Sequence, residues 1–175
     1  MSGSQTLPGA EPVRQEPRLV LASGSPRRRQ LLELLGIPCR VVPSGIDELQ
    51  LPEEDAAAFA LRAARDKAVA VAGRGGDLPV LGSDTVVEVG GVALGKPADT
   101  SHATEMLRQL AGRAHHVHTG VALVAGGRCE SLVDTALVRF LPLDDAMIRW
   151  YVATGEPMDK AGAYAVQGRG GLLVE

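Results

Sequence analysis

The stretch RLVLASGSPRRRQLLELLG, residues 18–36, decides how the N-terminal half of this 175-residue chain folds. Residues 18–22 are mostly apolar and predict a strand. Ser25 is a good helix N-cap, Pro26 suits the first helical position, and Gly36 suits the position that ends a helix. The helix would bury an apolar stripe, formed by Leu31, Leu32 and Leu35. The stretch therefore predicts a strand that passes directly into a helix.

The turn between this strand and this helix offers a site for an anion. The backbone N–H groups of Ser-Gly-Ser-Pro stand at a helix N-terminus, where the helix dipole favours negative charge. Arg27, Arg28 and Arg29 lie in the first helical turn, where cations are otherwise unfavourable. A bound anion would compensate for them. A solvated basic turn is the alternative that the residues leave open.

The remaining segments predict strands and helices that alternate along the chain. Strands are expected at Val41–Val42, on both sides of an interruption at Gly82–Thr85, in a hairpin closing on Gly90–Gly91, at 115–125 and 128–141, and at Leu172–Val174. Further helices are expected at 53–72, around Ala103–Leu110, and from the cap Asp144 to about Ala153. Hairpins among alternating elements predict an α/β fold with a mixed, partly antiparallel sheet and flanking helices. Residues 1–18 are expected to form a disordered leader, followed by one domain over 19–175.

The composition argues against several classes of function. The chain is 45% hydrophobic and 22% charged, as is usual for a soluble globular domain. A net charge of −3 and an aromatic content of 3% argue against a nucleic-acid-binding surface. No apolar run reaches membrane-spanning length, and residues 1–18 lack the apolar region typical of a signal peptide. Cys39 and Cys129 form no CxxC pair, so we expect a protein of the reducing cytoplasm.

Two charged residues stand in apolar surroundings. On the predicted helix over 53–72, Lys67 has only alanine and valine at i±3 and i±4. Its ammonium would either extend to water or reach into a cleft. Asp84 lies between PVLG and VVEV, which both look like buried sheet. A buried carboxylate must be paired, hydrogen-bonded or bound to a metal, and a structural Asx-turn is the alternative.

Other motifs carry weaker signals. The segment GGVALGKP, residues 90–97, has the G-x-x-x-x-G-K spacing, but Pro97 excludes a P-loop and leaves Lys96 as a candidate phosphate contact. The histidines of AHHVH, residues 114–118, have no cysteine or carboxylate nearby to complete a metal site. The polar segment GEPMDKAGAYAVQGRGG could bind a ligand through three side chains, Asp159, Lys160 and Gln167.

Four motifs, in this order, resemble the Maf family of nucleoside triphosphate pyrophosphatases. They are LASGSPRRRQLLELLG, GSDTVVEVGGVALGKPAD, MLRQLAGRAHHVHTGVAL and GEPMDKAGAYAVQG, and they extend over almost all of residues 19–174. The resemblance implies a two-lobed α/β fold, related to that of the inosine triphosphate pyrophosphatases, with a nucleotide cleft between the lobes. It also implies a divalent metal, Mg²⁺ or Mn²⁺, and it allows a homodimer.

The resemblance further assigns roles to residues of this sequence. Asp84 would be the general base or the metal-bound activator of water, with Glu48, and after it Asp47, as the acidic partner around the metal. The triphosphate would be held by one serine and four cations, namely Ser23, Arg27, Arg28, Lys67 and Lys96. Three positions mark the branch that prefers dTTP and UTP, and here they are Arg27, Thr85 and Gln167. Arg29 matches no family role and is expected to be a surface charge.

The resemblance thus predicts an enzyme that hydrolyses dTTP, UTP and related modified nucleotides to the monophosphate and pyrophosphate, with metal-activated water attacking the α-phosphorus. The alternatives are a nucleotide-binding regulator of cell division with little catalysis, or the same chemistry on 7-methyl-GTP or CTP. No nucleic acid or membrane is expected as a partner. The sequence departs from the family where Ala165–Val166 replaces the usual Gly-Ile. Family members also continue past position 175 with a strand and a helix, which this domain would lack.

Overall fold

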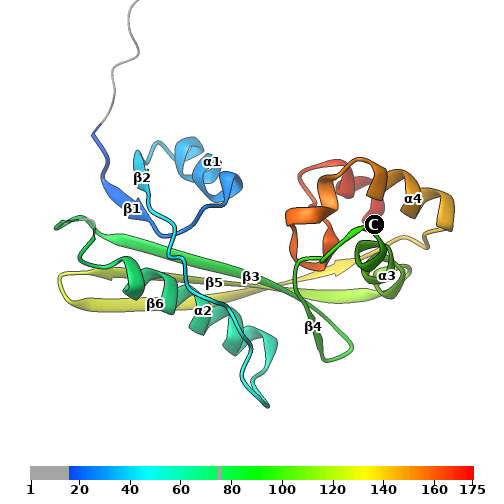
Figure 1. Cartoon of the computed structure of the whole chain (residues 1–175), viewed down its shortest axis with the longest axis horizontal. Coiled ribbons are helices and arrows are strands. Elements are labelled where there is room, and N and C mark those ends of the chain that lie inside the picture. Colours follow the sequence, from blue (N-terminus) through cyan, green and yellow to red (C-terminus); the bar gives the residue numbers. More distant parts are fainter. Residues whose placement is uncertain (1–15, 75) are drawn as a thin grey trace, which may run out of the picture.

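The computed structural model of this protein describes residues 16–74 and 76–175 (Figure 1). The leader expected over residues 1–18 therefore lies almost entirely outside the described residues. The strands are β1 (Leu19–Leu21), β2 (Cys39–Val41), β3 (Val80–Val89), β4 (Val92–Leu94), β5 (Ala114–Ala125) and β6 (Arg128–Arg139). The α-helices are α1 (Pro26–Leu34), α2 (Ala56–Val71), α3 (Thr100–Leu110) and α4 (Asp145–Ala153). Three short 3₁₀ helices follow, η1 (Glu156–Asp159), η2 (Ala161–Ala163) and η3 (Arg169–Leu173).

All six strands belong to one mixed sheet, which confirms the predicted fold class. Its strand order is β2-β1-β3-β5-β6, and β4 pairs with β3 beside this path. β1 is parallel to both of its neighbours, β2 and β3. The pairs β3–β4, β3–β5 and β5–β6 are antiparallel. The parallel part thus comes from the N-terminal strand–helix–strand unit and the antiparallel part from the hairpins.

Side chains close to the helix ends explain where the helices begin, and for α1 and α4 the sequence predicted the position correctly. Pro26 is at the start of α1, directly after its N-cap Ser25. The carboxylates of Asp55, Asp99 and Asp144 cap α2, α3 and α4, because each accepts a hydrogen bond from a backbone N–H of the first turn. These caps need only residues that are neighbours in sequence. The positions where these helices begin therefore depend on residues close to them in sequence.

Four predicted features differ from the structure. Residues 82–85 do not interrupt a strand, because β3 is continuous and pairs residue by residue with β5 through this region. Residues 172–174 do not form a strand: the chain there ends a 3₁₀ helix and makes only an isolated bridge from Val174 to Phe140. On α1, Leu32 is buried whereas Leu31 and Leu35 are exposed, since little of the protein packs on their side of the helix. The second strand is also shifted, from Val41–Val42 to Cys39–Val41.

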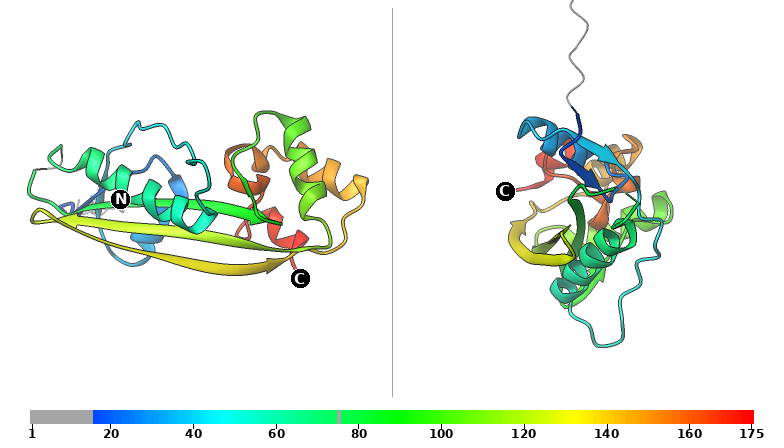
Figure 2. Two further views of the ribbon diagram at one scale, coloured as in Figure 1. Left: turned by 90° about the horizontal axis from the view of Figure 1, so that it is seen from below. Right: turned by 90° about the vertical axis from the view of Figure 1, so that its left-hand side faces the viewer.

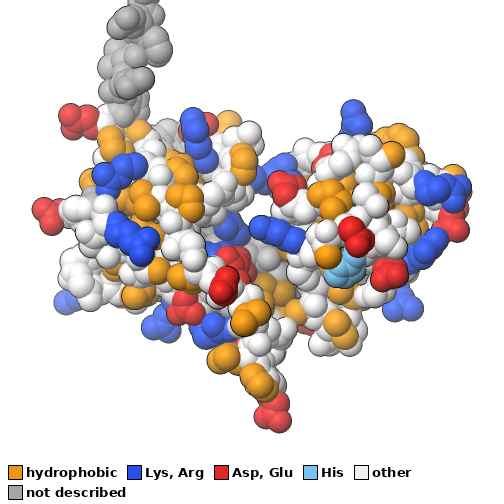
Figure 3. All heavy atoms as spheres, in the orientation of Figure 1, with side chains coloured by type: hydrophobic (Ala, Val, Ile, Leu, Met, Phe, Trp, Pro, Cys, Tyr) orange, Lys and Arg blue, Asp and Glu red, His pale blue; other side chains and the backbone are white. Residues whose placement is uncertain are grey.

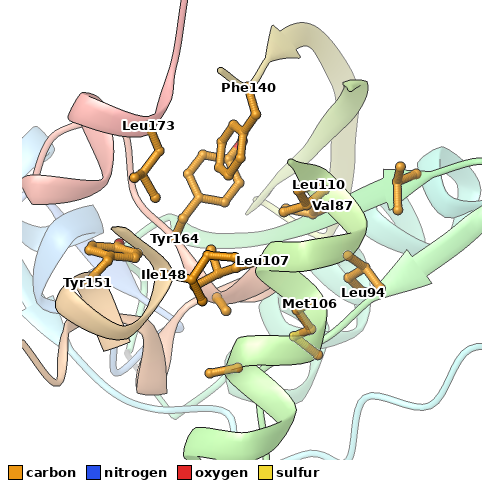
Figure 4. Close-up of a cluster of buried hydrophobic side chains, with 13 residues drawn as sticks. Val87, Leu94, Met106, Leu107, Leu110, Phe140, Ile148, Tyr151, Tyr164 and Leu173 are labelled. Carbon is orange, nitrogen blue, oxygen red and sulfur yellow. The ribbon is translucent and has the colours of Figure 1, made fainter. Parts of the chain in front are cut away.

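The protein has two lobes, each with its own apolar core, as the resemblance implied. In the first lobe α2 packs on β1, β3 and β5 around Val20, Val71 and Val80. In the second lobe α3, α4 and the 3₁₀ segments surround a larger core that includes Leu107, Tyr151 and Tyr164 (Figure 4). The long strands β3, β5 and β6 run from one lobe to the other (Figures 1 and 2). Figure 3 shows a hollow between the lobes where acidic and basic side chains meet.

Helix α2 lies unusually close to the sheet because two strand residues facing it are glycines. A Cβ atom at Gly82 would stand 2.1 Å from the carbonyl oxygen of Ala64, and one at Gly120 would stand 2.1 Å from that of Ala60. Such distances are far below van der Waals contact, so only glycine permits this packing. The alanines of α2 complete the close approach, and together they bring the helix directly above the middle of β3.

None of the helices in residues 16–74 and 76–175 combines the length with the apolar character needed to cross a membrane.

Candidate active site

The centre of the candidate site is a cluster of one ammonium and two carboxylates, of which Lys67 and Asp84 are buried and Glu48 is exposed. The Nζ of Lys67 on α2 lies 2.6 Å from Oδ1 of Asp84 and 2.8 Å from Oε1 of Glu48. Lys67 is 5% exposed and Asp84 is 7% exposed. Burial of this kind is tolerated only when charges are paired. Lys67 therefore does not extend to water. Its ammonium reaches inward to the carboxylates of Asp84 and Glu48.

The position of Asp84 follows from the sheet. Asp84 is the residue of β3 opposite Gly120 of β5, in the middle of a continuous ladder. Strand side chains alternate between faces, so Asp84 shares the α2-facing side with Gly82. The alternative that Asp84 forms a structural Asx-turn is therefore wrong. Gly82 and Gly120 make room for α2, and Asp84 between them meets the one lysine on that face of the helix.

The strand–helix turn adds a serine and an arginine to this cluster. Arg28 Nη1 donates a 2.9 Å hydrogen bond to the hydroxyl of Ser23. Its Nη2 lies 3.8 Å from Oδ1 of Asp84. Burial lowers the pKa of the Arg28 guanidinium, while the charges of Asp84 and Glu48 act in the opposite direction. The turn predicted to bind an anion thus points a half-buried arginine at the Lys67–Asp84 pair.

A second arginine of the same turn reaches the other lobe. Arg27 Nη1 donates a 2.6 Å hydrogen bond to Oε1 of Gln167. Gln167 belongs to the segment between η2 and η3 in the second lobe. Two residues assigned to base selection by resemblance are thus in direct contact. The neighbouring Arg29 instead pairs with Glu33, four residues along α1, at 2.7 Å, which confirms it as a surface charge.

Two predicted site residues lie apart from the charged cluster. Thr85 follows Asp84 in β3 and faces the opposite side of the sheet, where its hydroxyl lies 3.4 Å from that of Thr119. Lys96 is exposed after β4, and none of the hydrogen bonds or ion pairs found in the described ranges involves it. Its charge, after the larger effect of the hydrogen-bonded Lys160, helps to lower the pKa of Asp159. Lys96 and Lys160 are therefore cations of the second lobe.

Two histidines of 114–118 make hydrogen bonds to other side chains, His115 to the segment after η2 and His118 to the neighbouring strands. His115 is buried, and its Nε2 lies 2.7 Å from the hydroxyl of Tyr164. His118 contacts Thr135 at 2.9 Å and Glu88 at 3.2 Å. In the described part of the chain, no group of three or more His, Cys, Asp and Glu side chains is arranged to hold a metal ion.

Sequence reasoning missed the residues that hold Glu48 in place. Arg62 on α2 makes two hydrogen bonds of 2.7 Å to the carboxylate of Glu54, and a third, of 2.8 Å, to the carbonyl oxygen of Leu49. Glu54 also accepts a bond from the N–H of Leu51 at 3.0 Å. The loop that carries Glu48 is thereby fastened to the helix that carries Lys67. No sequence spacing rule links Glu54 to Arg62, so these contacts could be identified only from the structure.

Comparison with known proteins identifies the family of this chain and several of its relatives. The family model described as "Maf-like protein" matches residues 18–175. A protein of Pectobacterium atrosepticum is 50% identical over 158 residues, covering 90% of this chain and 80% of its own length. One of Anaeromyxobacter sp. strain Fw109-5 is 52% identical over 163 residues, covering 90% and 77%. One of Escherichia coli O6:K15:H31 is 48% identical over 157 residues, covering 89% and 80%. All three are named dTTP/UTP pyrophosphatase.

Proposed function

This chain belongs to the Maf family, and from that premise we propose that it hydrolyses dTTP and UTP to the monophosphate and pyrophosphate. The observation that carries the proposal is the buried Lys67–Asp84 pair, with the exposed Glu48 and with Arg28 beside it. A cluster of this kind offers cations for phosphate oxygens and a carboxylate for a proton. Relatives that are about half identical and carry the corresponding name support the choice of substrate.

The hydrolytic step asks for positioning and charge neutralisation more than for covalent chemistry. In the proposed reaction a water oxygen attacks the α-phosphorus, and the bond from that phosphorus to the bridging oxygen of the β-phosphate breaks. Asp84 accepts the proton of the attacking water as a general base. Lys67, 2.6 Å from Asp84, orients this carboxylate and offsets charge that develops on the phosphate oxygens. Pyrophosphate leaves with the bridging oxygen.

The carboxylates of Glu48 and Asp84 fit a hard divalent cation. An oxygen of each carboxylate lies within 2.8 Å of the Lys67 ammonium, so the two carboxylates converge on a single positive charge. Magnesium is typically bound by one or two carboxylates together with substrate phosphates and water, and two carboxylates satisfy that pattern. We propose that these two residues hold Mg²⁺ or Mn²⁺, which would lower the pKa of a bound water.

The triphosphate would be bound from both lobes. Arg28, Ser23 and Lys67 face it from the first lobe, and Lys96 would contact it from the second. A triphosphate carries about four negative charges near neutral pH, so several cations and a metal match it. Arg27 and Gln167, already joined by a 2.6 Å hydrogen bond, would contact the base, with Thr85 as the third residue of the selecting set. We further propose a cytoplasmic protein able to form a homodimer.

A single assay tests this function. Purified protein is incubated with dTTP, UTP, CTP, GTP and 7-methyl-GTP in the presence of Mn²⁺, and products are separated by chromatography. We expect dTMP and UMP with pyrophosphate, formed faster than the products of the other nucleotides. Recovery of dTDP and orthophosphate would refute cleavage at the α-phosphorus. Binding of dTTP without any product would point to a regulator in place of an enzyme.

A further inference from the structure

The segment that carries Gln167 has little means of holding its own shape. Gln167 and Val166 are exposed, and the segment contains the glycines of Gly168-Arg169-Gly170. The 3₁₀ helix η3 begins at Arg169, and its N-cap Gly168 has no side chain that could accept the first N–H groups. Helix starts need acceptors for those groups. An acceptor from elsewhere must therefore define this turn.

The carboxylate of Glu156 is that acceptor. Its Oε2 accepts a 2.9 Å hydrogen bond from the N–H of Arg169, and its Oε1 accepts one of 3.1 Å from the N–H of Gly170. Oε1 also accepts a 2.9 Å hydrogen bond from the hydroxyl of Tyr151. Tyr151 is fully buried in the core of the second lobe. The turn is thus tied through one carboxylate to the rigid helix α4.

The glycines of the turn are shaped around this carboxylate. A Cβ at Gly168 would stand 2.3 Å from Oε1 of Glu156, and one at Gly170 would stand 2.6 Å from the hydroxyl oxygen of Tyr151. Burial disfavours the charged form of Glu156, but the N–H groups of Arg169 and Gly170 and the Tyr151 hydroxyl outweigh it, so its pKa is lowered. The carboxylate is therefore ionised at neutral pH, when it is the stronger acceptor.

Gln167 immediately precedes this clamped turn. The N–H of Gly168 donates to the carbonyl of Ala165 at 3.2 Å, which closes the chain around Val166 and Gln167. On the outer side Gln167 meets Arg27 of the first lobe at 2.6 Å. Arg27 thus orients the side chain of Gln167, whereas Glu156 holds the backbone that follows Gln167.

We propose that Glu156 is a positioning residue for base selection: it fixes the turn 168–170 and so sets where the amide of Gln167 meets the base of the nucleotide. The inference rests on the proposed function. The amide of Gln167 has a donor and an acceptor side, which suits the carbonyl oxygens and the N3–H group of a uracil or thymine. Discrimination through such hydrogen bonds is lost when donor and acceptor are displaced.

The first experiment is a double-mutant cycle on selectivity. The variants are Glu156→Ala, Gln167→Ala and the pair, and the readout is the ratio of kcat/KM for dTTP to that for CTP. We expect Glu156→Ala to lower this ratio about 3- to 10-fold, the size of one or two misplaced hydrogen bonds. In the Gln167→Ala background the same change should have no further effect on the ratio. Equal losses in both backgrounds would overturn the inference.

Two matched variants separate positioning from general damage. Tyr151→Phe removes only the hydroxyl that holds the carboxylate, and it should lower the ratio in the same direction as Glu156→Ala but less. Asp145→Ala removes an exposed carboxylate of α4 that pairs with Arg108, and it should leave the ratio unchanged. If Asp145→Ala lowered the ratio as much as Glu156→Ala, loss of any acidic side chain of the lobe would explain the effect, and the inference would fall.

A second readout does not depend on activity. Trypsin cleaves after Arg169, and the N–H of that scissile bond belongs to Gly170, which Glu156 holds. Release of the peptide that begins at Gly170, followed by mass spectrometry, should be faster for Glu156→Ala and Tyr151→Phe than for the wild type. Unchanged release would show that Glu156 does not fix the turn. A wild-type protein without preference for dTTP or UTP would instead refute the proposed function, whatever the release rate.

Discussion

Arg27 and Gln167 are 140 residues apart in sequence, yet their side chains share a 2.6 Å hydrogen bond. Arg27 comes from the first turn of α1 in one lobe, and Gln167 from the segment before η3 in the other. The contact therefore joins the two lobes directly. Both residues belong to the set that we propose selects the base. A base that enters there meets a pair whose two members already orient each other.

The contact predicts that Arg27 and Gln167 act as a unit. Arg27→Ala and Gln167→Ala should each lower kcat/KM for dTTP by about tenfold, and the double variant should lose little more, because contacting residues are not additive. Arg29→Ala is the matched control, since Arg29 is the next-but-one arginine and pairs only with Glu33 among the described residues. It should leave dTTP hydrolysis unchanged. Fully additive losses would mean that the two residues select the base independently.

Asp84→Asn should abolish turnover while nucleotide binding persists. The amide keeps the shape of the side chain and can still accept a bond from Lys67, but it cannot take a proton from water. We expect kcat to fall by at least about 100-fold, with a dissociation constant for dTTP, measured by calorimetry without metal, within a few-fold of the wild type. Asp134→Asn, an exposed residue of β6, serves as the control. A fully active Asp84→Asn protein would remove Asp84 from its role as base.

Lys67→Met should destabilise the fold as well as slow the reaction. Removal of the ammonium leaves Asp84 and Glu48 facing each other without the cation that now lies within 2.8 Å of both. Loss of one partner from a buried ion pair costs about 3 kcal/mol or more of unfolding free energy, measurable by urea denaturation. Lys96→Met, at an exposed lysine, should change stability by less than about 0.5 kcal/mol while it raises KM for the nucleotide. Similar losses from both variants would argue against a buried cluster.

Glu54 should make stability depend on pH in the acid range. The hydrogen bonds from Arg62 lower the pKa of Glu54 from 4.5 to about 2. Because the pKa is lower in the folded state, the contribution of Glu54 is fully present above about pH 4.5 and is lost as pH falls towards 2. The difference in unfolding free energy between wild type and Glu54→Gln should therefore shrink from pH 6 to pH 2.5. A constant difference across that range would contradict the shift, and the exposed Glu53→Gln is the control.

Much of the fold was predictable because the signals were local. Pro26 stands at the start of α1, Asp144 caps α4, and Gly126–Gly127 turns β5 into β6, each at a position set by residues close in sequence. The motif order also indicated the family. These features depend on backbone conformation at single positions, which neighbouring residues determine.

The candidate site was decided by contacts that no local pattern contains. The sequence left open whether Lys67 extends to water, and it placed a break at Gly82–Thr85. In the structure Gly82 and Gly120 let α2 settle on the sheet, β3 runs unbroken, and Lys67 reaches Asp84. Burial and pairing between distant segments follow from how the elements pack, because a charge is stable inside the protein only where packing brings its partner. By itself, then, the sequence determined most of the elements and the family. Only the tertiary structure decided which charges meet between the lobes.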